Sequence, residues 1–462
     1  MSTLQSLPRD ILVHTLHFIP HTALPQLSAV SKTLKHITTP EIYRYIHYHD
    51  PWNTPRYPSW QSKHPQVHEQ SGDDTRRRRD TRIFSLSRFL RTMSESAELR
   101  NCVVGASFFC NTTEGDDLAA KVVELLKASE KFRHLHFAPF GALDSSLITP
   151  VLNVVTSLEI RFDHLGPTPG SDSVPMDRCY EIFCLPGLRS LAIILVRSWT
   201  RRSSTEASTE AERSKSSSRW RTSKITCLSL LATVRPGPDL VEMLSWPVCL
   251  QSLHYQLATD GGSELNTPAI DFRTVLETQK ICLEELVVYG CYHEDDDQGY
   301  MVTEVIDLCS FGKLRVVVLD IRYMLVRESK LDADADDADA GASVGVHTET
   351  RKAKAICEML PPSLEHLQLQ LGGWSEGLPP EDTVIVCDDI GNVLEGIVRN
   401  RRYDGVCKGL KGLKSMMMWY PIDCDTEEIC LWKFRGFEQL LDCAGGAGIE
   451  VSGWVGREPA LF

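Results

Sequence analysis

The sequence has no long apolar run, and this absence limits where the chain can reside. The longest uninterrupted apolar stretch is Leu191–Val196, six residues, whereas a membrane-spanning helix needs about 20. Pro8, Arg9 and Asp10 occur within the first ten residues, so the segment lacks the apolar core of a secretory signal peptide. We therefore expect no membrane partner, and residence in the cytoplasm, the nucleus or both.

Closely paired cysteines and a surplus of positive charge are also lacking. None of the 15 cysteines is spaced C-x-x-C, which argues against a zinc knuckle. Their odd number fits free thiols in a reducing compartment. The chain has 49 Lys and Arg residues against 62 Asp and Glu residues, a net charge of −13, which argues against a nucleic-acid partner. Apolar residues make up 42% of the chain, enough for a packed core.

Motifs for phosphate binding and metal hydrolysis do not stand out either. The nearest approach to a phosphate loop is Gly445–Gly448, and no Lys-Ser/Thr pair follows it. This stretch better fits the end of a helix over 427–443, before a last strand at 449–451. No His-Glu-x-x-His motif occurs. The sequence therefore predicts no catalytic residue, no metal site and no cofactor, although an enzyme whose site is assembled from distant residues stays open.

The first 50 residues have the spacing of three or four short helices. Ser31 can cap one of them, and Thr39-Pro40-Glu41 has the composition of another helix start. The segment carries more apolar positions than so few helices can bury among themselves. This excess favours a helical hook that completes its core against a partner. A helical cap on the following domain is the alternative.

Several landmarks in this segment also occur in a characteristic order. They are Leu7-Pro8, Ile11-Leu12, the Leu24/Leu27 pair and Val30-Ser31-Lys32. The segment resembles an F-box, and the chain resembles F-box proteins of the fungal type. The resemblance implies that residues 1–50 bind the small adaptor of a Skp–cullin–F-box ubiquitin ligase, and through it a cullin. The implied adaptor-binding or hook-forming residues are Leu7, Pro8, Ile11, Leu12, Leu16, Leu24, Leu27, Val30, Ser31 and Leu34.

Residues 51–83 change in character. Four prolines fall between positions 51 and 65, and Arg76–Arg79 is a run of arginines. Such a segment is typical of a flexible linker, with a nuclear-localisation patch as the alternative. Helical spacing resumes at Phe84, followed by a strand near Val103 and Val104.

An apolar-x-x-apolar-x-apolar pattern then recurs nine times. Its copies are Phe132/Leu135/Phe137, Val155/Leu158/Ile160, Leu188/Leu191/Ile193, Ile225/Leu228/Leu230, Leu250/Leu253/Tyr255, Leu283/Leu286/Val288, Leu314/Val317/Leu319, Leu364/Leu367/Leu369 and Leu413/Met416/Met418. The last two positions alternate, which suits a strand with one buried face. Helical patterns lie between copies, one of them capped by Asp116, one following Asp239, and others over 270–276, 302–308 and 353–360.

This alternation predicts an α/β fold in which an N-terminal all-α F-box helical hook precedes an irregular leucine-rich-repeat-like α/β solenoid over 84–462. Spacing between copies ranges from 23 to 50 residues (Leu135 to Leu158, Val317 to Leu367), so insertions are needed. Segments near 200–224 and 328–350 are predicted to be disordered insertions. A doubly wound α/β enzyme is the structural alternative.

Polar residues beside the repeat apolars predict a face for a protein target. They are His134, His136, Glu159, Arg161, Ser190, Ser229, His254, Gln256, Glu285, Arg315, Asp320, His366, Gln368 and Gln370. With the F-box resemblance, this implies a non-catalytic substrate receptor of a ubiquitin ligase that binds an unknown protein substrate. The alternative is a repeat scaffold whose N-terminal helices are only a cap, or bind the adaptor outside a ligase.

Overall fold

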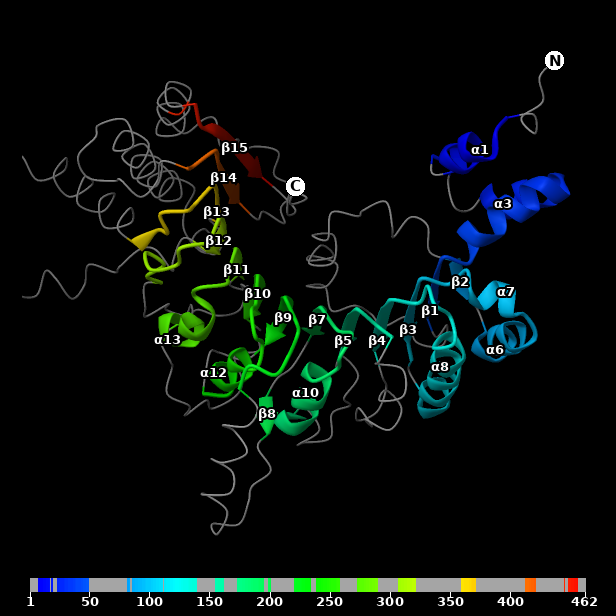
Figure 1. Cartoon of the computed structure of the whole chain (residues 1–462), viewed down its shortest axis with the longest axis horizontal. Helices are drawn as coiled ribbons and strands as arrows, with labels where there is room; N and C mark the ends of the chain where they lie inside the picture. The colour runs from blue at the N-terminus through cyan, green and yellow to red at the C-terminus, as the bar shows by residue number, and fades with distance from the viewer. Residues whose placement is uncertain are drawn as a thin grey trace, which may run out of the picture. The chain divides into compact units, whose positions relative to one another are not determined.

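A computed structural model of the chain shows a mixed α/β protein with parallel strands (Figure 1). The structure describes residues 7–16, 18–19, 23–49, 81–83, 85–110, 112–138, 154–161, 173–194, 198–200, 220–233, 238–257, 272–289, 306–320, 359–370, 412–420, 444 and 448–455. The chain divides into two compact units. The first comprises Met1–Lys215, Thr222–Leu231 and Ala460–Phe462, and the second comprises Ser216–Arg221 and Ala232–Pro459.

Three helices open the first unit: α1 (Arg9–Leu16), α2 (Leu24–Val30) and α3 (Lys32–Ile42). The predicted cap at Ser31 is confirmed, because its side chain accepts a hydrogen bond from the Leu34 N–H at 3.1 Å. The predicted helix start at Thr39-Pro40-Glu41 is wrong. Pro40 lies inside the last turn of α3, where a missing N–H costs only one bond before the helix ends.

The first unit continues with alternating strands and helices. Its elements are β1 (Tyr45–His49), β2 (Thr81–Ile83), α6 (Leu86–Glu95), α7 (Ala97–Arg100), β3 (Gly105–Phe109), α8 (Thr113–Leu126), β4 (His134–Ala138), β5 (Ser157–Arg161), β6 (Ser173–Pro175), α10 (Met176–Phe183), β7 (Ser190–Ile194), β8 (Ser198–Thr200) and β9 (Cys227–Thr233). Seven of the strands pair in parallel in the order β2-β1-β3-β4-β5-β7-β9. The short strands β6 and β8 pair separately.

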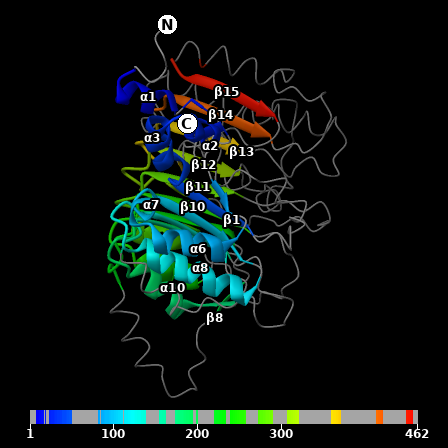
Figure 2. The same ribbon diagram turned by 90° about the vertical axis from the view of Figure 1, so that its right-hand side faces the viewer.

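The second unit repeats the same construction. Its elements are α12 (Pro238–Ser245), β10 (Ser252–Leu257), α13 (Phe272–Leu276), the 3₁₀ turn η4 (Glu277–Gln279), β11 (Glu285–Tyr289), β12 (Val316–Asp320), β13 (His366–Gln370), β14 (Ser415–Tyr420) and β15 (Glu450–Val455). Its six described strands are parallel and lie in chain order, as Figure 2 shows for β12 to β15. The last of them confirms the strand predicted at 449–451.

The last two positions of each repeat copy lie on a strand of their own, the first position lies just before that strand, and neighbouring copies are in register. Leu135 is paired with Leu158, and Leu286 with Val317. Every described side chain at the 27 pattern positions is buried; the Met418 side chain lies outside the described residues. The strands follow one another almost without reversal, since only β2 is out of sequence. This order differs from that of a doubly wound sheet, which reverses near its middle.

A ladder of backbone hydrogen bonds ties each strand to the preceding one just before the strand begins. The carbonyl of Arg133 accepts the N–H groups of Thr156 at 2.8 Å and Ser157 at 3.0 Å. The same two-donor arrangement recurs at the carbonyls of Arg44, Val104, Thr156, Arg189, Gln251, Glu284, Arg315 and Glu365. One carbonyl per turn therefore fixes where the next strand starts.

The helices bury one apolar face against the strands. Helices α6, α8 and α10 lie on one side of their sheet (Figure 2). In α8, Ala119, Val122 and Leu126 are fully buried, which confirms the predicted helix. Its cap, however, is Thr112, whose side chain accepts from Gly115 N–H at 3.0 Å. Asp116, the predicted cap, is instead buried within the helix.

Several segments differ from their predicted structure. Tyr45–His49, expected in the helical segment, is strand β1, and Thr81–Ile83, expected in the linker, is strand β2. Strand β3 begins at Gly105, just after the predicted position. Residues 306–308, the described end of the helix predicted over 302–308, are not helical. At the edges of the first predicted insertion, 198–200 form β8 and Ser223 is buried.

Other predicted segments lie outside the described residues. These are 51–80, 201–219, 328–350, the helix over 427–443, and all but the last two residues of the helix over 353–360.

A buried glutamine braces the turn between α12 and β10. Gln279 is 1% exposed. Its side-chain oxygen accepts from the Leu250 N–H at 2.9 Å, and its side-chain nitrogen donates to the carbonyls of Leu244 at 2.7 Å and Pro247 at 3.0 Å. Three backbone groups of one turn therefore depend on a single side chain from the next repeat.

We predict that Gln279→Ala lowers the free energy of unfolding by about 1–3 kcal/mol, because it leaves three buried backbone groups unpaired. Urea unfolding followed by circular dichroism measures this change. Gln251→Ala is the matched control, since the Gln251 side chain is exposed and only its carbonyl is used in the ladder. Equal destabilisation by both variants would contradict the bracing role of Gln279.

Candidate functional site

Helices α1 to α3 bury some of their apolar residues in a common core and expose others at the surface. Leu12, Leu16, Leu24 and Ile37 form a buried cluster, with Leu27 packed against it. Leu34 is also buried. Of the ten residues implied to bind the adaptor, these leucines therefore hold the helices together. This helix-to-helix core is largely closed to a partner, although Leu12 and Ile37 also line a cleft.

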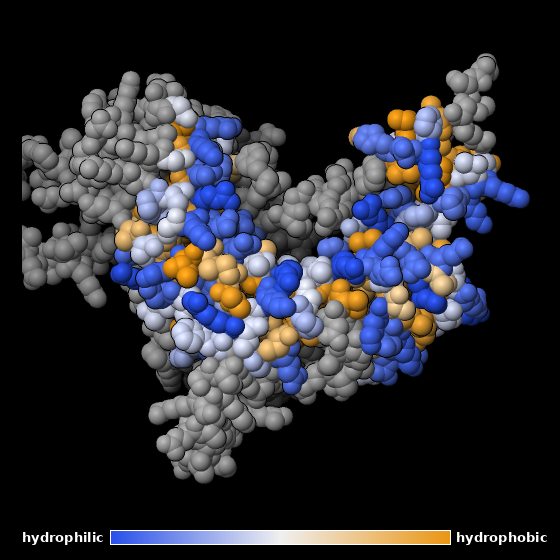
Figure 3. All heavy atoms as spheres, viewed as in Figure 1, coloured by the Kyte–Doolittle hydropathy of each residue, from blue (hydrophilic) through white to orange (hydrophobic). Residues whose placement is uncertain are grey.

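Four large apolar residues of this segment are exposed instead. Leu7 is 40% exposed, Ile11 51%, Phe18 76% and Val30 66%, and apolar atoms gather over the N-terminal helices in Figure 3. We call these four residues the N-terminal apolar patch. Pro8 is exposed beside it, and Ser31 is occupied as the cap of α3. Phe18 was not among the predicted contact residues, because Phe18 falls outside the helical spacing of α1.

A cleft of about 400 Å³ opens beside this patch, between α1 and α3. Leu7, Leu12 and Ile37 line it together with Arg9, Thr33, Lys32 and His36. Apolar side chains and the cationic side chains of Arg9 and Lys32 thus line the same cleft. Such a cleft suits an apolar side chain carried on an acidic segment of a protein partner.

A second cluster lies on the outward sheet positions of the first unit, crossing β1, β3, β4 and β5. His136 Nε2 is 2.9 Å from Glu159 Oε1. The His136 ring meets the Phe109 ring edge-on at 4.6 Å between centroids, and the guanidinium of Arg161 lies over the same ring at 5.8 Å. His47 approaches Phe109 from the other side at 5.2 Å. A His–Glu contact and a largely buried aromatic ring therefore lie side by side across these strands.

Gly105 leaves room for the Tyr45 ring of β1. A Cβ atom at Gly105 would lie 2.8 Å from the Tyr45 ring and 3.2 Å from the His134 Cβ. These are the residues that Gly105 pairs with on its two sides. The Tyr45 and His134 rings thereby approach to 6.4 Å between centroids. A side chain at this position would displace the Tyr45 ring.

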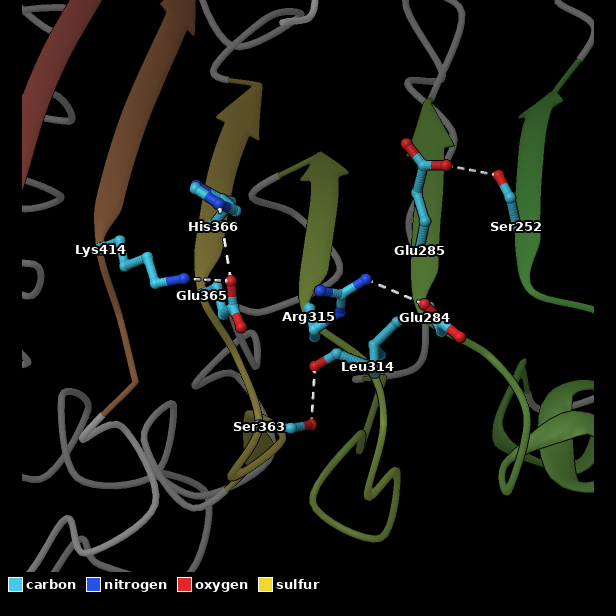
Figure 4. Close-up of polar contacts among 9 residues, drawn as sticks. All are labelled: Ser252, Glu284, Glu285, Leu314, Arg315, Ser363, Glu365, His366 and Lys414. Carbon is cyan, nitrogen blue, oxygen red and sulfur yellow. Dashed lines mark hydrogen bonds and ion pairs between the residues drawn. The ribbon is translucent and has the colours of Figure 1, made fainter.

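The outward positions of the second unit carry ordered polar contacts (Figure 4). Ser252 Oγ donates to Glu285 Oε2 at 2.6 Å, and His254 Nε2 lies 3.5 Å from the same oxygen. Burial by itself would raise the pKa of Glu285. Hydrogen bonds from His254 and Ser252 and the charge of His254 outweigh it, so that the pKa lies below its ordinary 4.5.

Charges of alternating sign follow the carbonyl ladder of this unit. Arg315 Nη2 is 2.9 Å from Glu284 Oε2, and Lys414 Nζ is 2.6 Å from Glu365 Oε2. The hydrogen bond from Lys414 lowers the pKa of Glu365. These pairs join consecutive turns (Figure 4), and being accessible to solvent they contribute little to stability.

Some residues predicted on the exposed face are buried or lie outside a strand. Arg161, Gln256, Gln368 and Gln370 are buried, and Arg315 precedes its strand. The other members that lie on a strand with described side chains are half-buried or exposed: His134, His136, Glu159, Ser190, Ser229, His254, Glu285 and His366. The Asp320 side chain lies outside the described residues. The predicted face is thus exposed in part, and four of its predicted members are buried.

The sequence also contains one motif that is typical of a catalytic serine. Gly341–Gly345 has the G-x-S-x-G spacing of a nucleophile elbow. It lies in the Asp- and Ala-rich stretch and outside the described residues. Within the described ranges, no three or more His, Cys, Asp or Glu residues gather as a metal site requires, and no described helix is long and apolar enough to span a bilayer.

The chain matches no protein-family model, and no curated protein matches it either.

We predict that Glu285→Gln lowers the free energy of unfolding at pH 7 and that its effect disappears in acid. The folded-state pKa of Glu285 is depressed, so its stabilisation is complete above about 4.5 and is lost as the pH falls through the lower folded value. Urea unfolding at pH 7 and at pH 3 measures both effects.

Glu277→Gln is the control for this measurement. Glu277 is paired with Lys280 on the surface, with 49% of its side chain exposed, so its loss should change stability by less than about 0.5 kcal/mol. A Glu285→Gln effect as small as that of the control, or one unchanged at low pH, would contradict the assigned role of Glu285.

Proposed function

We propose that this chain is the substrate-recognition subunit of a Skp–cullin–F-box ubiquitin ligase. The N-terminal helices bind the small adaptor, and the parallel strand repeats bind a protein target. The chain itself performs no covalent chemistry. Its contribution is to hold the target at high effective concentration near the ubiquitin-carrying enzyme.

The observation that carries the proposal is the N-terminal apolar patch. Helices α1 to α3 already have their own buried core, yet Ile11 and Val30 remain 51% and 66% exposed. Scattered single apolar residues on a surface need no explanation, whereas a group of large ones on a short helical segment marks a protein contact. The order of the F-box-like landmarks indicates which contact this is.

The outward sheet positions support a target-binding role for the repeats. The half-buried His136–Glu159 pair lies at outward strand positions beside the Phe109 ring, which is 8% exposed. Aromatic residues and arginine are enriched at protein interfaces, whereas glutamate is depleted there, so the support comes from Phe109 and Arg161. A target segment that crosses the strands would contact several repeats at once.

The alternative is a repeat scaffold whose N-terminal helices cap the sheet or bind the adaptor outside a ligase. The direct connection from α3 into β1 favours the cap, since Val104 N–H donates to the Arg44 carbonyl at 2.8 Å. A dispersed enzyme site is less favoured at the sheet surface. The backbone N–H groups there are engaged by neighbouring strands, and an oxyanion hole needs free donors.

The exposed patch gives a sharper test than the buried leucines of the same segment. Leu12 is 4% exposed, so Leu12→Ala would disturb the helical core and adaptor binding together. We predict that Ile11→Asp combined with Val30→Asp in the full chain reduces adaptor recovery at least tenfold, or about 1.4 kcal/mol. The measurement is a pull-down of the chain co-expressed with the adaptor and a cullin.

Ile281→Asp is the matched control, because Ile281 in the second unit is 59% exposed. It should recover as much adaptor as the unchanged chain. Recovery of the adaptor without the cullin would support the scaffold alternative. Equal recovery by the double variant and the control, or no recovery by any of these chains, would sink the adaptor-binding proposal.

A further inference from the structure

Two cysteines occupy equivalent turns in the second unit. Cys249 directly precedes Leu250, and Cys282 directly precedes Leu283, the first positions of successive repeat copies. Both side chains are half-buried. The ladder bond from Glu284 N–H to the Gln251 carbonyl, 2.8 Å, lies two residues beyond each cysteine. The register of β10 and β11 therefore places the two cysteines opposite each other.

The distance between such positions suits a disulfide. Neighbouring strands are about 4.8 Å apart, and the Cα atoms of disulfide-bonded cysteines are usually about 4.4–6.8 Å apart. The two thiols also lie within hydrogen-bonding reach of each other. Gln279 holds this turn rigidly, because its side-chain oxygen accepts from the Leu250 N–H next to Cys249.

Reagents in solvent can reach the pair. Val248 and Ile281, the residues just before the two cysteines, are 47% and 59% exposed. A buried cysteine such as Cys179, at 1% exposed, has no such access. The two thiols thus combine proximity with accessibility.

We propose that Cys249 and Cys282 form a reversible disulfide when the protein meets a peroxide. The Cys282 sulfur attacks one oxygen of hydrogen peroxide, the O–O bond breaks, and a sulfenic acid and water result. The Cys249 sulfur then attacks the Cys282 sulfur, and its proton leaves with the hydroxyl as a second water. Two thiols and one peroxide thereby give one disulfide and two waters. A thiol reductant reverses the reaction.

The thiol chemistry indicates how fast this reaction runs. Burial and the hydrogen bond to Cys282 raise the pKa of Cys249 to about 11, against a smaller opposing effect of Lys313. Since the thiolate is the nucleophile, the attack of Cys249 on the oxidised Cys282 should accelerate as the pH rises from 7 to 9.

The full chain treated with hydrogen peroxide, then alkylated and digested with trypsin, tests the proposal. The expected product joins peptide 225–273 to peptide 281–313, is lighter than their sum by two hydrogens, and disappears on reduction. Cys249→Ser and Cys282→Ser should each abolish it. Cys227→Ser and Cys309→Ser are matched controls in the same two peptides and should retain it.

Two outcomes would overturn the proposal. One is a cross-linked peptide pair that persists in Cys249→Ser or Cys282→Ser. The other is the absence of the cross-link in the unchanged chain under conditions where the exposed Cys184 is oxidised. Neither outcome depends on adaptor binding, so the test is independent of the ligase proposal.

Discussion

The fold depends on one recurring interaction, the carbonyl that accepts two successive N–H groups of the next turn. At Thr156, for example, the carbonyl accepts from Arg189 and Ser190 at 2.8 and 3.0 Å. Because both donors belong to the start of a strand, the bond sets the position and direction of that strand together. Burial of the apolar residues just before and after these donors, which are Leu188, Leu191 and Ile193 at this turn, then adds the free energy that holds the strand there. The side chains at the ladder positions differ from turn to turn, and some of them pair with one another, as Arg315 does with Glu284.

This explains which parts of the fold were predictable. The apolar triplets fall on strands because burial of alternate residues is recorded in the sequence itself. Strand β1 was missed, since Tyr45–His49 has aromatic and histidine residues where the other strands have aliphatic ones. Strand β2 is only three residues long and carries no such pattern. The division of the repeats into two units, near the end of β9, also has no local signal.

The candidate sites, like the fold, could be predicted only in part from the sequence. The sequence identifies the apolar residues of α1 to α3, but it does not separate Leu12, in the core, from Ile11, on the surface, because the two are adjacent in a helix whose burial depends on α2 and α3. Likewise, the contacts of Phe109 with His136 and Arg161 join three strands. Only the register of those strands brings the residues together. The cysteine pair Cys249 and Cys282 is separated by 32 residues and becomes visible through register in the same way.

The pairing of β12 with β13 shows that this fold can accept insertions between its turns. Val317 and Leu367 are 50 residues apart and yet are direct partners. Closing a longer connection costs little, about 0.6 kcal/mol for each doubling of its length. The carbonyl of Arg315 accepts the N–H groups of Glu365 and His366 across this long connection, just as other carbonyls do across shorter ones. Segments can therefore enter or leave between turns without shifting the strands on either side. A fold of this kind can acquire new surface loops at one turn while the remaining turns keep their contacts.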